Sequence, residues 1–187
     1  VVHRPGRSFQ RMAGLEMGFK EVIIYEEVLK EFQKQKVKYV IVGGIAVNLL
    51  GSLRSTADMD ILVEMSDSNL AKVVRTLTRQ GYRVKQPVDP MGMAEEATRK
   101  DWIHNKHMKA FNFYKEGEFR EVDIIIETPV PFEQAQKTAL RVRCGDIVLP
   151  VISIDNLIKM KKKSFLNIDK VDIEELRKIK RLRKKIK

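Results

Sequence analysis

The order of apolar and polar positions along the chain predicts a fold in which helices alternate with short strands. Apolar residues repeat at helical spacing in four segments, which are residues 22–35, 67–80, the stretch that starts at Ser153, and 169–186. Continuous apolar runs, typical of buried strands, occupy residues 39–42 and 61–63. The first of these runs stops at Gly43-Gly44, where we expect a tight turn into a short helix over residues 45–50.

The second half of the chain predicts two hairpins. Residues 108–114 alternate between two faces, residues 115–118 can form a turn, and residues 120–126 supply a return strand. A short helix over residues 132–138 and a smaller hairpin over 142–149 follow. The pattern therefore indicates an α/β (α+β) protein that ends in a basic helix, whose apolar side we expect to pack on the body.

Length and composition bound the domain organisation and the setting. A chain of 187 residues fits one domain with an appendage. Residues 1–16 lack periodicity and do not begin with Met, so we interpret them as a disordered leader or an expression remnant. We expect the core to span residues 17–152 and a helical segment that packs on it to span residues 153–187. The single cysteine excludes an internal disulfide and favours a reducing, cytoplasmic location, and no apolar run is long enough for a membrane span.

The net charge of +11 is concentrated at the ends of the chain. Residues 159–187 hold thirteen basic and four acidic residues, whereas residues 21–158 hold nineteen basic and twenty acidic ones. A basic helix of this kind can bind the phosphate backbone of a nucleic acid, or it can be an ordinary solvated surface. Composition favours neither interpretation.

The most informative chemistry lies between residues 39 and 63. A buried strand leads into Gly43-Gly44, a short helix follows, and Asp58 and Asp60 stand at the head of the next strand. Residues i and i+2 of a strand share a face, which places these carboxylates roughly 7 Å apart at their Cα atoms. Two like charges this close favour a divalent cation such as Mg²⁺, and the glycines leave backbone N–H groups open to a phosphate.

This arrangement resembles the nucleotidyltransferase fold of the polymerase-β superfamily. The likeness rests on Gly43-Gly44, a short helix, Gly51-x-x-Arg54-x-Thr56 and then Asp58-x-Asp60 on an apolar strand. It is to the small, minimal members, including the group that contains the AbiEii-type toxins, and it implies a small mixed sheet flanked by helices. The resemblance also implies a third carboxylate, at Asp123 on the return strand of the hairpin, and a lysine, at Lys161, that reaches toward the nucleotide.

The function that the resemblance implies is Mg²⁺-dependent transfer of a nucleoside monophosphate from a nucleoside triphosphate to a hydroxyl. Two Mg²⁺ ions would be held by Asp58, Asp60 and Asp123, and Asp123 would also take the proton of the acceptor. The residues expected to contact the nucleotide are Gly43, Gly44, Arg54, Thr56 and Lys161.

The acceptor stays open between the 3′ end of an RNA, a protein side chain and a small molecule such as an aminoglycoside, with the basic helix favouring RNA. Two other hypotheses remain at this point. One is a catalytically silent module of a toxin–antitoxin or regulatory pair, which would have a protein partner. The other is a non-enzymatic RNA-binding domain. The sequence does not indicate which nucleotide is the substrate or what the oligomeric state is.

Overall fold

A mixed seven-stranded sheet organises the computed structural model, which describes residues 22, 24–163 and 166–185. The segment 1–16, interpreted above as a leader, lies outside these residues. The strands are β1 (Tyr39–Ile41), β2 (Met59–Val63), β3 (Tyr82–Val84), β4 (Ala110–Lys115), β5 (Glu121–Ile125), β6 (Leu140–Cys144) and β7 (Ile147–Val151), in the order β3-β4-β5-β2-β1-β7-β6. The pairs β2–β5 and β1–β7 are parallel and the others antiparallel. The predicted α/β class with a mixed sheet is therefore confirmed.

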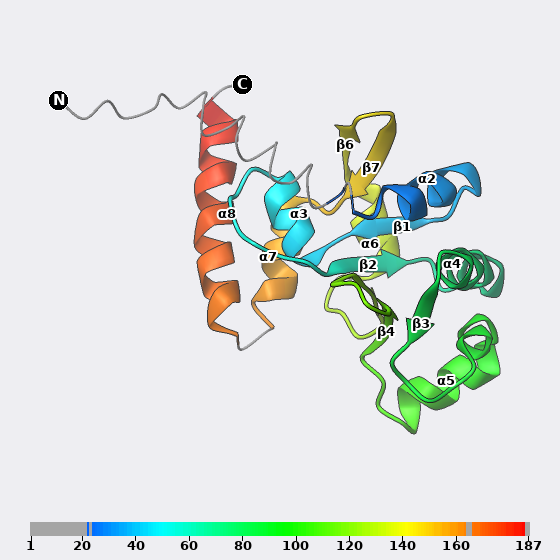
Figure 1. Ribbon diagram of the computed structural model, residues 1–187. Helices are drawn as coiled ribbons and strands as arrows, with labels where there is room; N and C mark the ends of the chain where they lie inside the picture. Colours follow the sequence, from blue (N-terminus) through cyan, green and yellow to red (C-terminus); the bar gives the residue numbers. More distant parts are fainter. Residues whose placement is uncertain (1–21, 23, 164–165, 186–187) are drawn as a thin grey trace.

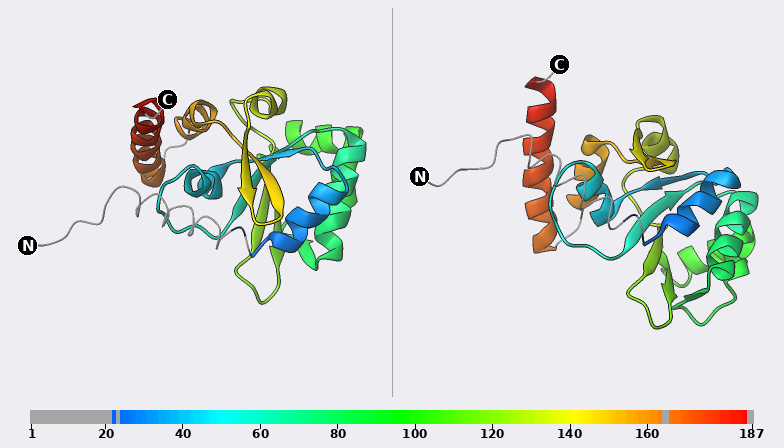
Figure 2. Two further views of the ribbon diagram at one scale, coloured as in Figure 1. Left: turned by 90° about the horizontal axis from the view of Figure 1, so that it is seen from above. Right: turned by 45° about the horizontal axis from the view of Figure 1, so that its top comes forward.

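Most of the described helices form two groups. The described helices are α2 (Glu26–Lys34), α3 (Gly43–Leu49), α4 (Asp67–Arg79), α5 (Glu96–His104), α6 (Phe132–Lys137), α7 (Ile154–Lys161) and α8 (Asn167–Lys185), with a 3₁₀ turn, η1 (Pro90–Ala94). Helices α3, α7 and α8 gather at one end of the molecule, and α2, α4 and α5 lie toward the other (Figures 1 and 2). No helix in the described part of the chain combines the length and the apolar content that a bilayer span requires.

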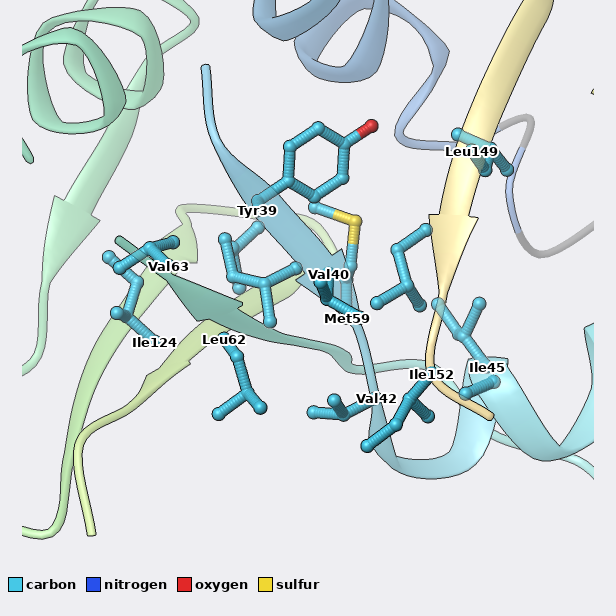
Figure 3. Packing of buried hydrophobic residues seen from close by; sticks show 14 of the residues in the cluster. Tyr39, Val40, Val42, Ile45, Met59, Leu62, Val63, Ile124, Leu149 and Ile152 are labelled. Carbon is cyan, nitrogen blue, oxygen red and sulfur yellow. The ribbon is translucent and has the colours of Figure 1, made fainter. Parts of the chain in front are cut away.

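The core fills the space around the two central strands. All residues of β1 are buried, Val40 pairs with Leu62 of β2, and Figure 3 shows Ile124 of β5 next to Val63 of β2. A strand that is apolar on both faces is stable only when both are covered. Because both faces of the central strands are covered, residues 39–42 and 61–63 are continuous apolar runs in the sequence.

Strands β4 and β5 are covered on one face only. Phe111 and Phe113 of β4 are buried, as are Val122 and Ile124 of β5, whereas the alternating residues between them are partly exposed. The partly exposed residues are Ala110, Asn112, Tyr114, Glu121, Asp123 and Ile125. This part of the sheet therefore presents an open polar face, which we call the open β4–β5 face.

Between residues 82 and 104 the structure contains β3, η1 and α5, which the pattern did not predict. Strand β3 has only three residues, and α5 buries only Arg99 and Trp102, so its amphipathic signal is weak. Tertiary contacts hold α5 instead: the Trp102 ring stacks on Phe111 with centroids 5.4 Å apart, and the Arg99 guanidinium donates to the carbonyls of Met65 and Met93.

Helix α8 packs on the body less extensively than its pattern predicts. Leu176 is fully buried and Ile179 partly so, but Val171 and Leu182 are about half exposed. The reason is that α8 lies along α7 at the edge of the molecule (Figure 2), so one narrow stripe of the helix is covered.

Replacing Phe111 tests the packing under the open β4–β5 face. Phe111 is fully buried and contacts both Trp102 and Phe113. We expect Phe111→Ala to lower the free energy of unfolding by about 3–5 kcal/mol, because a cavity replaces the ring. Phe119→Ala is the matched control, since Phe119 is 95% exposed, and it should change stability by less than about 0.5 kcal/mol. Similar urea midpoints for the two variants would contradict this account of the core.

Candidate active site

The parallel pairing of β2 and β5 brings two of the predicted site residues together. Asp60 lies directly opposite Asp123 in the register, and neighbours in register share a face of the sheet. Asp58 precedes Asp60 by two residues, in the exposed segment just before β2. The three carboxylates predicted from the sequence therefore belong to one edge of the open β4–β5 face.

Burial and neighbouring charges raise the pKa values of all three carboxylates. Burial raises the pKa of Asp60 to about 7, and the charges of Asp123 and Asp58 add to this effect. Burial also raises the pKa of Asp58 and of Asp123, with nearby Glu121 contributing to both. The site thus concentrates more negative charge than the surrounding protein neutralises, which is the electrostatic condition for holding a cation.

The carboxylates of Asp58, Asp60 and Asp123 fit Mg²⁺ as a partial set of ligands. Carboxylate oxygens are the ligands that this hard ion prefers. Among residues 22, 24–163 and 166–185, however, no three Asp, Glu, His or Cys side chains converge closely enough to enclose an ion. Mg²⁺ in enzymes that act on nucleotides is usually held by one or two carboxylates together with substrate phosphates, rather than by a complete protein cage. The arrangement of Asp58, Asp60 and Asp123 agrees with that mode.

Helix α3 starts directly over the Asp60 carboxylate because its first residues are glycines. Gly43 has a φ of +62°, and a Cβ there would lie 1.8 Å from Asp60 Oδ2. A Cβ on Gly44 would lie 2.5 Å from Thr56 Oγ1. The Gly44 N–H hydrogen-bonds to the Asp60 carboxylate and lowers its pKa. The predicted glycine turn is therefore the first turn of the helix itself, and it brings backbone N–H groups to the carboxylates.

The segment that carries Asp58 is held at both ends by buried polar side chains. Fully buried Asn48 donates from Nδ2 to the Arg54 carbonyl at 2.7 Å and accepts from the Arg54 N–H at 3.2 Å. The Tyr25 hydroxyl lies 2.5 Å from the Ala57 carbonyl and 2.8 Å from the Glu121 carbonyl. These contacts fix the approach to Asp58 relative to β5.

A second polar group, which sequence reasoning missed, surrounds Asp123. Asn112 Nδ2 donates to Asp123 Oδ1 at 2.8 Å, and Gln86 Nε2 donates to Asn112 Oδ1 at 2.8 Å. Beside them Lys85 and Glu121 form an ion pair at 2.5 Å. One signal for this group was present, because Asn112 stands between two buried phenylalanines on an alternating strand and so must face away from the core.

Lys161 and Arg54, the two predicted phosphate-binding cations, both bind acids of α8. The Lys161 ammonium lies 2.5 Å from Asp169 Oδ1 and 2.7 Å from Asp172 Oδ2. Arg54 Nη1 lies 2.6 Å from the same Asp172 oxygen. Lys161 is also close enough to Asp60 to lower its pKa. The cations thus border the predicted site, but they are held by partners that the sequence analysis did not identify.

A mixed sheet with paired carboxylates beneath a glycine-initiated helix agrees with the nucleotidyltransferase fold that the sequence resembles. The family model for aminoglycoside-2″-adenylyltransferase matches residues 25–174, and the chain belongs to that family. The predictions of a nucleotidyltransferase and of an enzyme are confirmed, and the two non-catalytic hypotheses are set aside. The match is to this family and not to the AbiEii-type toxin group, and it gives no support to a toxin–antitoxin partnership.

Solved structures show the same fold. The lincosamide antibiotic adenylyltransferase LnuA, bound to lincomycin, is 21% identical with a TM-score of 0.58, over 86% of this chain and 96% of that chain. ANT(2″)-Ia in complex with adenylyl-2″-tobramycin is 14% identical with a TM-score of 0.54, over 88% of this chain and 95% of that chain. A search of curated proteins found no match.

Gly43→Ala tests the close approach of α3 to Asp60. The new Cβ would overlap the carboxylate, and the positive φ adds strain, so we expect the free energy of unfolding to fall by about 2 kcal/mol or more. Gly117→Ala is the control, because Gly117 also has a positive φ (+75°) but a Cβ there would meet no atom within 4 Å. Equal losses of stability in thermal unfolding would contradict the proposed overlap.

The crowding of carboxylates predicts an unusual dependence of stability on pH. The pKa of Asp60 is raised to about 7 in the folded protein, against about 3.9 when unfolded. Its contribution to stability is therefore complete below about pH 4 and is lost as the pH rises through 7, at up to about 1.4 kcal/mol per pH unit.

In metal-free buffer we expect Asp60→Asn to become more stable than the parent as the pH rises from 5 to 8. Added Mg²⁺ should stabilise the parent at pH 8 but not this variant. Asp146→Asn, in the exposed β6–β7 turn, serves as the control. Urea unfolding at both pH values measures the effect, and parallel curves for all three proteins would show that Asp60 is not destabilised by its neighbours.

Proposed function

We propose that the protein transfers AMP from ATP to a hydroxyl of a small antibiotic, with an aminoglycoside as the first acceptor to test. The observation that carries this proposal is the crowded set Asp58, Asp60 and Asp123 beneath a glycine-initiated helix, in a chain of an adenylyltransferase family. Two structural neighbours contain a small antibiotic or its adenylylated product, which supports an acceptor of this size.

Asp58, Asp60 and Asp123 are the proposed ligands of Mg²⁺. We predict that two ions bind there. Bound Mg²⁺ would neutralise phosphate charge and make the acceptor hydroxyl easier to deprotonate. Gly43 and Gly44 would let the triphosphate approach the backbone N–H groups at the start of α3. Thr56, Arg54 and Lys161 would contact the nucleotide from the side of the loop and of α7.

The reaction itself is an in-line displacement at the α-phosphorus. The acceptor oxygen forms a bond to that phosphorus, the bond to the bridging oxygen of the β-phosphate breaks, and pyrophosphate leaves. Asp123 is the proposed base that takes the hydroxyl proton, since its pKa is raised by burial and Asn112 holds one of its oxygens. The Asn112 contact would keep the other oxygen directed toward the acceptor.

The open β4–β5 face is the proposed acceptor platform. Glu121 is partly exposed there, and its charge acts on both Asp58 and Asp123. An acidic platform suits an acceptor that carries amino groups better than it suits RNA, whose phosphates it would repel. An ammonium group of the acceptor would compete with Lys85 for Glu121.

We also keep as proposals the division into residues 17–152 and 153–187 and a cytoplasmic location.

Incubation with ATP, Mg²⁺ and a panel of aminoglycosides, lincosamides and bulk tRNA tests the activity. We expect pyrophosphate release and an antibiotic heavier by one adenylyl group, and both should stop when the metal is chelated. Asp60→Asn and Asp123→Asn should lower kcat/KM by about 10³-fold, because a metal ion contributes several kcal/mol and about 1.4 kcal/mol is tenfold in rate.

Asp146→Asn should react like the parent. Transfer that survives both site substitutions with folding retained would refute the assignment of the acids. If tRNA is labelled and the antibiotics are not, the acceptor is RNA.

A further inference from the structure

Four charged side chains connect α8 to the edge of the proposed nucleotide site. We call Arg54, Lys161, Asp169 and Asp172 the α8 ion cluster. Lys161 and Asp169 are each 8% exposed and Asp172 only 3%, so three of the four charges are removed from solvent. The cations come from α7 and from the loop before β2, and both acids come from α8.

Asp172 contacts both cations of the α8 ion cluster. Its Oδ2 oxygen accepts from Arg54 Nη1 at 2.6 Å and from the Lys161 ammonium at 2.7 Å. Asp169 Oδ1 accepts from Lys161 at 2.5 Å. A single carboxylate therefore fixes the relative positions of two cations that are more than a hundred residues apart in sequence.

The cluster is built to orient the cations rather than to attract a distant anion. Two positive and two negative charges cancel, so the group adds little net field at the site. The cationic side is the one near the catalytic acids, because the Lys161 ammonium acts on the Asp60 carboxylate. A long lysine or arginine side chain loses considerable rotational freedom when it binds a phosphate, and partners that hold it extended beforehand remove part of that cost.

We propose that Asp172 is a positioning residue of the nucleotide site, which holds Lys161 and Arg54 in place for the triphosphate beside Asp60. This inference rests on the function proposed above and deepens it. It makes α8 a part of the active site, acting through its buried acids rather than through its basic surface.

Other contacts attach α8 to the body independently of Asp172. Leu176 is fully buried, and Arg183 Nη2 donates to the Leu50 carbonyl at 3.0 Å. Lys180 of α8 also forms an ion pair with Asp155 of α7, and both side chains are exposed. The Asp155–Lys180 pair joins the same two helices as the Asp172–Lys161 pair, so it provides a control for docking alone.

Equilibrium binding of the Mg²⁺ complex of α,β-methylene-ATP to the full chain, measured by calorimetry without acceptor, tests the proposal. We expect Asp172→Asn to weaken binding by about tenfold or more, because two charge-assisted hydrogen bonds are lost. Asp155→Asn should bind like the parent. Asp169→Asn should lie between them, and Asp172→Glu, which keeps the charge, should recover part of the affinity.

With turnover, Asp172→Asn should raise the KM for ATP and leave the KM for the acceptor unchanged. Circular dichroism checks that each variant is folded. If Asp172→Asn does not fold, the affinities of Asp169→Asn and Asp172→Glu still test the proposal. Unchanged affinity in Asp172→Asn, or an equal loss in Asp155→Asn, would overturn the inference. Tighter binding would overturn it as well, because the carboxylate would then compete with phosphate. A parent protein that binds no nucleotide would instead refute the proposed function.

Discussion

Like-charge repulsion among Asp58, Asp60 and Asp123 is the constraint around which the rest of the structure is arranged. Carboxylates on adjacent strands destabilise the folded protein unless a cation neutralises them, and burial raises the pKa of Asp60 to about 7. Nearby Lys161 and Lys85 offset only part of this repulsion, and uncharged groups also maintain the arrangement. Gly43 leaves room above the Asp60 carboxylate, and Asn48 and Tyr25 fix the segment that carries Asp58. Stability is thus reduced at the proposed active site, where a metal ion would need a concentrated negative charge.

The topology of the sheet explains why the acids meet and why they remain accessible. The parallel register of β2 with β5 brings together residues that are distant in the chain, and the one-sided cover of β4 and β5 leaves their other face open. Phe111 and Phe113 supply the buried side, and Asn112 between them faces the acids. The same alternation that stabilises the edge of the sheet therefore builds the proposed acceptor platform.

Local patterns in the sequence predict the central part of the fold and the pair Asp58 and Asp60, and the family resemblance adds Asp123. Residues 39–42 and 61–63 are recognisable as buried strands because both of their faces are covered, and the spacing of Asp58 and Asp60 is a property of any extended chain. Features that depend on contacts between distant segments were not predictable. Helix α5 is held by the stacking of Trp102 on Phe111, and Asn112 acquires its role only when β4 pairs with β5. Asp169 and Asp172 looked like ordinary members of a solvated helix, since nothing nearby in sequence marks the two cations that they meet.

Helix α8 shows why the net charge of a segment is a poor guide to its partner. By composition the helix is strongly basic, which favoured RNA in the sequence analysis. In the folded protein most of its described basic residues are exposed, while Asp169 and Asp172 are buried and bind Lys161 and Arg54. The charge that α8 presents to the site is therefore negative, opposite in sign to the helix as a whole. Since electrostatic interactions fall off within about 10 Å at ordinary ionic strength, the buried acids, which contact Lys161 and Arg54, are better placed to influence the proposed site than the exposed lysines and arginines of α8.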